Sequence, residues 1–311
     1  MLGYTLRQLE YFVAVGETGS IAAASEKVNV SSPSISAAIA HLEAVFGLPL
    51  FVRQHAQGLS LTTAGKQMFE QAKNVLNESA GLVDLAGDIS GTVRGPLSVG
   101  CLVTFAQMVL PAVRRSFVTT YPDVRVRQYE LNQLEIFSGL RRAEIDLALT
   151  YDLDVPADLN FVPLLDLPPF VLVNEDHSLA GRDSVTVQDL VPHPMVLLDL
   201  PLSSDYFLSF FTQIGAKPII AERTRDMAVM RSMVGNGFGY SIANVRPLRG
   251  VAPDGKKLQF LPFEGDVRPM RMGLLMAKDV ESANVVRAFV AHCKSLQEGG
   301  VLPELAGGSG L

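Results

Sequence analysis

The chain has 311 residues, of which 48% are hydrophobic and 19% are charged, and its formal net charge is −6. This composition is typical of a folded globular protein and excludes a long disordered chain, and the length predicts two or three domains. The negative charge excludes a surface that is basic throughout, so a nucleic-acid-binding function must depend on a local site.

The first third of the chain predicts three short helices, a hairpin and one long helix. Apolar residues recur at helical spacing, Pro33 stands in the first turn of the third helix, and Gly47 follows its end. Because the long helix is too long and too exposed for a small domain, we expect it to mediate dimerisation. These elements are expected at residues 5–17, 21–28, 33–46, 49–53, 59–62 and 62–89.

After a helix-breaking segment at 90–96, strands and helices alternate along the remaining two-thirds of the chain. Alternation of this kind predicts βαβ units and largely parallel sheets. Helices are expected here at 105–120 and 132–143, and a further helix is expected to begin at Ser203. Strands are expected at 97–102, 124–131, 145–151, 170–175, 194–200, 217–223, 238–243 and 270–277.

The N-terminus has no basic region followed by a long apolar run, and no window of about 18 uninterrupted apolar residues occurs in the chain. We therefore expect no signal peptide, no membrane span and a cytoplasmic location. The two cysteines, Cys101 and Cys293, lie far apart in the sequence, which fits a reducing compartment better than a disulfide framework.

Three N-terminal stretches, LRQLEYFVAVGETGSIAAASEKVNVSSPSISAAIAHLE, FGLPLFVR and LTTAG, stand in the order and spacing of a known family. With them the chain resembles the LysR-type transcriptional regulators. Similarity continues in YPDVRV, LRRAEIDLALTY and GFGYS, which are less specific. The resemblance implies an α/β multi-domain protein that has a winged helix-turn-helix, a linker helix and an effector-binding domain.

The resemblance also implies domain boundaries. The winged helix-turn-helix would span 1–61, the linker helix 62–90 and the effector-binding domain 91–311. The effector-binding domain would consist of two α/β subdomains like those of periplasmic binding proteins. Subdomain I would comprise 91–166 and 271–297, and subdomain II would comprise 167–270, so that an effector cleft lies between them.

In a helix-turn-helix, the second helix enters the major groove by its N-terminal end, which here reads SSPSIS. Ser31 or Ser32 is expected to cap this helix, and Ala37 or Ala38 to contact a thymine methyl group. Family members commonly carry Gln in place of Ser32 and a long polar side chain in place of Ala37 or Ala38, so this helix has a short reach. The candidate DNA contacts are Ser31, Ser32, Pro33, Ser34, Ser36, Ala37, His41 and Arg53.

The charge of the DNA-binding region is low. Residues 1–60 hold three basic and four acidic residues, a net charge of −1. Since affinity for DNA depends on neutralising phosphates, we expect weak binding by each domain, compensated by several domains that bind together.

Candidate effector contacts lie at the carboxyl ends of expected parallel strands, where open α/β sheets bind ligands. Thr104 and Ser203 stand at helix N-termini and, together with Arg223, predict a small organic anion such as a carboxylate with an apolar or aromatic body. Two alternatives stay open: the hydroxyls are plain N-caps, and Arg223 pairs with Asp226 or Glu222. The candidates are Cys101, Leu102, Val103, Thr104, Thr150, Tyr151, Leu202, Ser203, Arg223 and Tyr240.

No G-x-S-x-G, H-E-x-x-H or P-loop motif occurs, and the histidines have no metal-ligand spacing. We therefore expect no catalytic residue, no metal and no cofactor besides the effector. The expected partners are double-stranded promoter DNA, further copies of the chain in a homodimer or homotetramer, and RNA polymerase. A solute-binding protein without DNA-binding activity is the alternative. A redox role of Cys101 is a lesser alternative, because buried cysteines are more often inert.

Overall fold

The computed structural model describes residues 3–54, 58–90, 92–247, 249–265, 267–278 and 283–305. The chain forms two compact units, Met1–Ser90 and Gly91–Leu311. No helix in the described ranges is long and apolar enough to cross a membrane.

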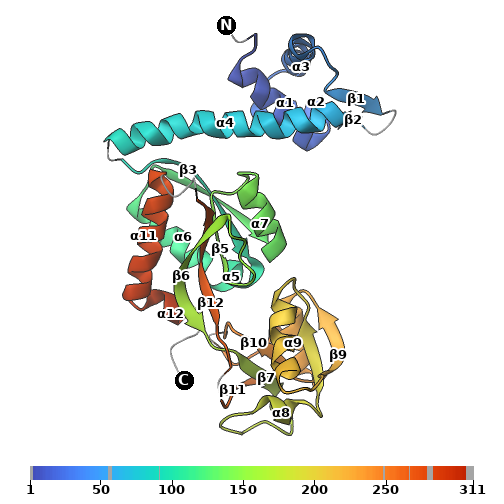
Figure 1. Cartoon of the computed structure of the whole chain (residues 1–311), viewed down its shortest axis with the longest axis vertical. Coiled ribbons are helices and arrows are strands. Elements are labelled where there is room, and N and C mark those ends of the chain that lie inside the picture. The colour runs from blue at the N-terminus through green and yellow to red at the C-terminus, as the bar shows by residue number, and fades with distance from the viewer. Residues whose placement is uncertain are drawn as a thin grey trace. The chain divides into compact units, whose positions relative to one another are not determined.

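The N-terminal unit combines short helices, an antiparallel two-stranded sheet and a long helix (Figure 1). Thr5, Ser20 and Ser31 cap the first three helices through their side-chain oxygens, and residues in the left-handed region end them. The elements are α1 (Leu6–Thr18), α2 (Ile21–Val28), α3 (Ser32–Phe46), β1 (Phe51–Gln54), β2 (Gly58–Leu61) and α4 (Thr63–Ser90).

The core of this unit includes Phe12, Ile35, Leu42 and Leu50, which are fully buried. The N-terminal half of α4 contributes Ala72 to this core, and Met68, Phe69 and Val75 pack against it. The expectation that α4 is too exposed to sit within a small domain is therefore wrong for this half. Farther along the helix Leu82 is 67% exposed, and the dimerising role of α4 stays a prediction.

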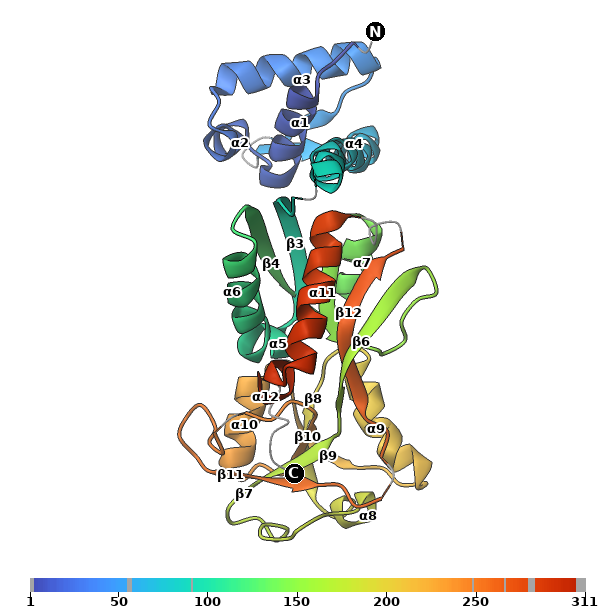
Figure 2. The same ribbon diagram turned by 90° about the vertical axis from the view of Figure 1, so that its left-hand side faces the viewer.

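Subdomain I of the second unit is built on a five-stranded sheet with the order β4-β3-β5-β12-β6. Helices α6 and α11 pack together on one face, where Phe117 meets Phe289, and α7 packs against β3 and β5 (Figure 2). Its strands are β3 (Gly95–Leu102), β4 (Val124–Leu131), β5 (Leu147–Tyr151), β6 (Leu159–Leu167) and β12 (Met270–Ala277). Its helices are α5 (Val103–Met108), α6 (Leu110–Thr120), α7 (Gln133–Arg141), α11 (Asn284–Glu298) and α12 (Val301–Leu305).

Subdomain II contains a three-stranded antiparallel sheet, β10-β7-β11, and the parallel pair β8-β9. A bridge between Met195 and Tyr240 joins the two. Its strands are β7 (Phe170–Asn174), β8 (Pro194–Leu198), β9 (Ile219–Thr224), β10 (Ser241–Ala243) and β11 (Leu258–Pro262). Its helices are α8 (Val187–Leu190), α9 (Ser203–Gln213) and α10 (Met227–Gly235).

The chain passes between the subdomains twice, after β6 and before β12. These two strands are antiparallel, and Leu167 pairs with Met270 at the crossing. The Tyr206 hydroxyl donates to the Arg268 carbonyl at 2.5 Å, and Asn244 Nδ2 donates to the Leu167 carbonyl at 2.7 Å. Side chains of subdomain II therefore hold both crossing segments.

The expectation of largely parallel sheets is only partly right. Parallel pairing joins β3 to β4 and β5, and β8 to β9, whereas β12 runs antiparallel because the chain returns from subdomain II along β6. Strands β6 and β11 were not predicted. The single helix expected over 105–120 is broken at Val109 (φ −110, ψ −56), because Pro111 in the next turn has no N–H to donate.

Candidate DNA-binding surface and effector cavity

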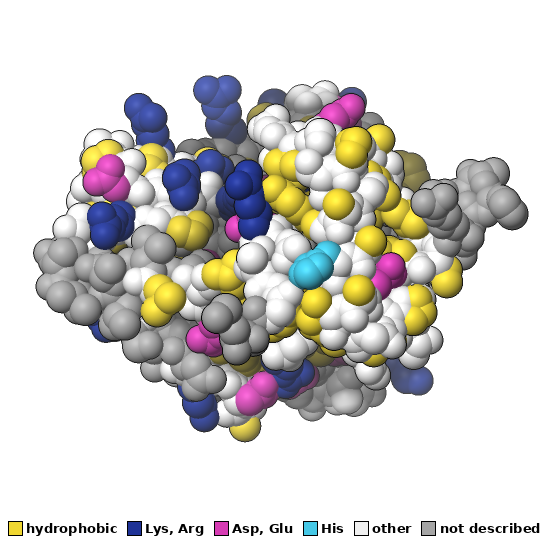
Figure 3. All heavy atoms as spheres, turned by 90° about the horizontal axis from the view of Figure 1, so that it is seen from above, with side chains coloured by type: hydrophobic (Ala, Val, Ile, Leu, Met, Phe, Trp, Pro, Cys, Tyr) yellow, Lys and Arg dark blue, Asp and Glu magenta, His cyan; other side chains and the backbone are white. Residues whose placement is uncertain are grey.

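The outer face of α3 is small and uncharged. Pro33, Ser34, Ser36 and Ala37 are exposed, whereas Ala38 is buried, so Ala37 is the residue of that pair available to a thymine methyl group. Figure 3 looks onto the N-terminal unit from above the view of Figure 1 and shows mainly neutral side chains around a histidine.

Two of the candidate DNA contacts, Ser31 and His41, make hydrogen bonds at α3, and a third, Arg53, lies on β1. Ser31, not Ser32, is the N-cap of α3, and its Oγ lies 2.8 Å from Ser34 Oγ. His41 Nε2 lies 2.8 Å from the Gly3 carbonyl, to which it donates, so this histidine ties the N-terminal residues to α3. Arg53 lies on β1 opposite Leu59, and its side chain is outside the described part of the structure.

A cavity lies between the two subdomains of the second unit, with an empty volume of about 580 Å³ that includes solvent at its mouth. Its lining is mostly apolar, and none of the described residues that line it is charged. Subdomain I supplies Leu102, Val103, Thr104, Leu131, Asn132, Gln133 and Tyr151. Subdomain II supplies Leu198, Leu200, Pro201, Ser203, Phe207, Met227, Ala243 and Asn244, and the crossing strand supplies Met270.

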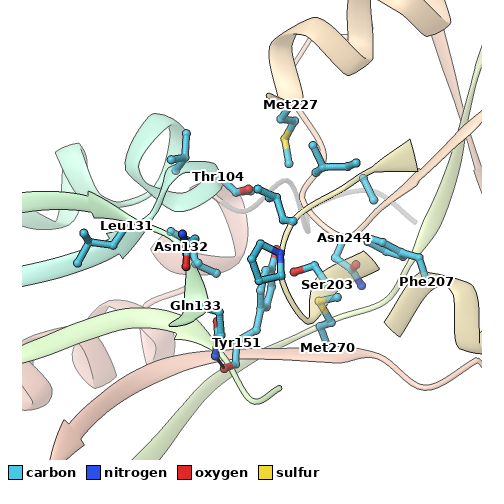
Figure 4. A pocket seen from close by; sticks show the side chains of 16 residues that line it. Thr104, Leu131, Asn132, Gln133, Tyr151, Ser203, Phe207, Met227, Asn244 and Met270 are labelled. Carbon is cyan, nitrogen blue, oxygen red and sulfur yellow. Dashed lines mark hydrogen bonds between the residues drawn. The ribbon is translucent and has the colours of Figure 1, made fainter. Parts of the chain in front are cut away.

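Thr104 and Ser203 turn their hydroxyls into this cavity (Figure 4). Neither is an N-cap, because the N-cap residues of α5 and α9 are Leu102 and Leu202, and no side chain caps either helix. Within the described residues neither hydroxyl has a hydrogen-bond partner, so both are free to bind a ligand. Leu202 has a φ of 64, and this left-handed backbone, which is strained for leucine, sets the start of α9.

Two amide side chains, those of Gln133 and Asn132, line the subdomain I wall of the cavity. Gln133 is buried and donates from Nε2 to the Tyr151 carbonyl at 3.0 Å, while its Oε1 accepts from Thr150 Oγ1 at 2.6 Å. Asn132 caps α7 by accepting from the Leu134 and Glu135 N–H groups. The Gln133 bonds tie the start of α7 to the end of β5 at the cavity wall.

Five of the ten expected effector contacts line the cavity, namely Leu102, Val103, Thr104, Tyr151 and Ser203. The other five do not. Thr150 is buried against Gln133, Leu202 precedes the wall residue Ser203, and Tyr240 is fully buried with no partner for its hydroxyl in the described structure. Arg223 is exposed and pairs with Asp199 at 3.1 Å, not with Asp226 or Glu222.

Cys101, the fifth of these, is fully buried on β3. Burial, and secondly the negative charge of Glu130, raise the pKa of its thiol well above the ordinary value. Cys293 is also buried and free, and burial raises its pKa to about 12. Because the thiolate is the reactive species, both environments oppose a redox role. The described residues also contain no group of three His, Cys, Asp or Glu side chains that could hold a metal.

Sequence reasoning missed most of the subdomain II wall. Asn132 and Gln133 follow the predicted strand at 124–131, so the rule that selected Thr104 would have selected them too. Asn244 and Met270 lie at the crossing, and only the fold brings them to the cavity.

A helix-turn-helix unit joined to a two-subdomain ligand-binding unit defines a class of ligand-responsive DNA-binding regulators. A family model described as the LysR substrate binding domain matches residues 90–298. A second model, described as the bacterial regulatory helix-turn-helix protein, lysR family, matches residues 6–66.

Individual proteins agree with these models. The transcriptional activator protein LysR of Escherichia coli (strain K12) is 29% identical over 306 residues, which are 98% of this chain and 96% of that protein. The crystal structure of HinK, a LysR family transcriptional regulator from Pseudomonas aeruginosa, has a TM-score of 0.64 at 34% identity and covers 94% of this chain and 99% of its own. Full-length CbnR complexed with its target DNA shares the fold, with a TM-score of 0.67 at 24% identity over 94% of this chain and 99% of its own.

The chain belongs to the LysR family of transcriptional regulators. It is a LysR-type DNA-binding regulator with an effector-binding domain, and the alternative of a solute-binding protein without DNA-binding activity is set aside because the helix-turn-helix model matches.

Proposed function

We propose that this protein controls promoters in response to a small effector that binds in the cavity between its subdomains. The observation that carries the proposal is the pair of unpartnered hydroxyls, Thr104 and Ser203, which face each other from different subdomains across an apolar space. A ligand that bonds both hydroxyls favours the arrangement in which the subdomains are close, and so shifts the population toward it.

The effector has an apolar body that carries polar groups. Phe207, Met227 and Met270 offer apolar contact area, while the hydroxyls and the Asn132 amide offer hydrogen bonds. We retain a carboxylate as the proposed polar group, since hydroxyls and N–H groups bind carboxylates. Arg223 is not part of this proposal, because it lies outside the lining and pairs with Asp199.

On DNA, we propose that the N-terminal end of α3 enters the major groove and that Ser34, Ser36 and Ala37 make short contacts there, with Arg53 on a phosphate. Because these side chains are short, sequence-dependent DNA shape contributes much of the selectivity. Binding by a homodimer or homotetramer supplies the affinity that one weakly charged unit lacks.

The rest of the proposal concerns the cellular setting. Action on promoter DNA places the protein in the cytoplasm and near RNA polymerase, and the named relatives are regulators, which supports a role without catalysis. No cofactor other than the effector takes part.

The test begins with the full-length protein and the intergenic DNA next to its own gene. Fluorescence anisotropy at low salt should show saturable binding by a dimer or tetramer, and the absence of binding would refute the regulator function.

Thermal-shift screening of small metabolites then identifies the effector. Thr104→Val and Ser203→Leu should abolish the effector's influence on DNA binding while basal DNA binding persists. Thr119→Val on α6, where the hydroxyl bonds the Arg115 carbonyl, is the matched control.

A further inference from the structure

Arg231 is a buried cation that no carboxylate in the described part of the chain neutralises. It lies on α10 in the stretch MAVMRSMV, which is apolar apart from Arg231 and Ser232, and is 8% exposed. Its Nη2 donates to the Val245 carbonyl at 3.2 Å and lies 3.9 Å from Met108 Sδ. Nε has no acceptor, and no carboxylate in the described ranges forms an ion pair with this guanidinium.

This arrangement is costly. A guanidinium taken out of water without a counter-charge loses its hydration and regains little from one carbonyl and one thioether. Burial accordingly lowers the pKa of Arg231. The aliphatic part of the side chain would pack equally well as methionine in this environment. The guanidinium is therefore suited to an anion supplied from outside the chain.

The position of Arg231 relates it to the effector cavity. Met227, one helical turn earlier on α10, lines the cavity (Figure 4), and Thr104, one turn before Met108 on α5, lines it from the other side. The guanidinium thus lies where α5 of subdomain I meets α10 of subdomain II, about one turn beyond the cavity wall. Of the charged side chains that the structure describes, Arg231 is the buried one beside this wall.

We propose that Arg231 binds the carboxylate of an organic-anion effector whose apolar body occupies the cavity. The inference rests on the proposed function and adds the residue that recognises the charge. Met108 has a flexible side chain, and its displacement exposes the guanidinium fork. The guanidinium then loses its weak contact with Met108 Sδ and gains two charge-assisted hydrogen bonds to the carboxylate of the effector. Because Met108 and Arg231 belong to different subdomains, the same exchange alters a contact between them and so couples binding to subdomain movement.

The experiment measures the unfolding temperature of the full-length protein with simple probes. Sodium acetate, hexanoate and benzoate are compared with sodium chloride at equal ionic strength and with the uncharged methyl benzoate. The variants are Arg231→Met, which removes the charge and keeps the length, and Arg225→Met, which removes an exposed arginine of the same segment. Ser203→Leu, which fills the cavity, is the third variant.

We expect at least one carboxylate to raise the unfolding temperature of the wild type more than chloride or the ester does. Without any probe, Arg231→Met should unfold about 2 °C or more above the wild type, because an uncompensated buried charge is gone. Its carboxylate response should be lost. Arg225→Met should respond like the wild type. A residue that serves only packing would give the opposite result, a lower unfolding temperature with an unchanged response.

Several outcomes overturn the inference: a full carboxylate response in Arg231→Met, a chloride response equal to that of every carboxylate, or no carboxylate response in the wild type. If the response disappears in Ser203→Leu but persists in Arg231→Met, the effector cavity stands and only the role of Arg231 is refuted. DNA binding, measured separately, decides the regulator function whatever these probes show.

Discussion

Gly65, in the first turn of α4, is a position where a single methyl group should disrupt the DNA-binding unit. A Cβ at this position would lie 2.0 Å from the Leu50 carbonyl oxygen and 3.1 Å from Thr62 Oγ1. The same oxygen accepts from the Thr62 N–H at 3.0 Å, and the Gly65 N–H donates to Thr62 Oγ1 at 2.7 Å. The glycine of the LTTAG stretch therefore permits the junction between α4 and the segment that precedes β1.

The cost of Gly65→Ala follows from these contacts. Moving the Leu50 carbonyl and the Thr62 hydroxyl away from the new methyl group breaks both hydrogen bonds, which are worth about 1 kcal/mol each. The crowding adds about 1–3 kcal/mol, and the better helix propensity of alanine returns about 1 kcal/mol. The unit should lose roughly 2–4 kcal/mol, a large part of the roughly 5–15 kcal/mol that stabilises a typical domain.

The assay is thermal unfolding together with anisotropy on promoter DNA. Gly81→Ala is the matched control, since its Cβ would meet nothing within 4 Å in the same helix. We expect Gly65→Ala to unfold about 8 °C or more below the wild type and to bind DNA poorly, and Gly81→Ala to be as stable as the wild type or more so. Wild-type stability and DNA affinity in Gly65→Ala would refute the reasoning.

Three further outcomes are expected. The free energy of unfolding, from urea titrations, should fall as the pH drops below about 6.5. Burial lowers the pKa values of His177 and His292 in the folded state, and the charge of His193 lowers that of His177 further. The unfolded state therefore binds protons first as the pH falls, which destabilises the folded state. An unfolding free energy that stays constant from pH 7 to 5 would contradict this. Tyr240→Phe should leave the effector response unchanged, and the free energy of unfolding should stay equal or rise by about 1 kcal/mol, because the Tyr240 hydroxyl has no described hydrogen-bond partner. A clear loss of unfolding free energy, measured by calorimetry, would refute this expectation. Ala37→Lys should steepen the salt dependence of DNA binding by about one unit per domain if α3 faces DNA, and Thr119→Lys on α6 should not.

The N-terminal unit was largely predictable because its signals are local. Ser20, Ser31, Gly19 and Gly47 mark helix ends by side-chain and backbone chemistry that acts within a few residues. The spacing within α4 puts Ala72 on the apolar stripe of that helix, but the element that covers it, α1, depends on how the chain folds.

Five of the residues that line the cavity were predicted from the sequence, because the end of a strand is also a local signal. Thr104 and Ser203 follow strands, and the rule for parallel sheets selects them as cavity-lining residues without any knowledge of the partner subdomain. Asn244 and Met270 come to the cavity only through the double crossing of the chain. Arg223 was chosen without considering an ion pair with Asp199. A single charge inside the mostly apolar stretch MAVMRSMV was a signal that could have pointed to Arg231.

The pairing of Leu167 with Met270 has a consequence for how subdomain II is joined to subdomain I. Everything between these residues, the whole of subdomain II, starts and ends at neighbouring positions of one antiparallel ladder, like the loop of a very long hairpin. Replacing it by a short turn would lower the entropy cost of closing this ladder only slightly, since that cost grows with the logarithm of loop length. Subdomain II is thus connected to subdomain I at one place, and exchanging it for a homologous subdomain would change one half of the cavity lining while Thr104, Asn132 and Gln133 of subdomain I stay in place.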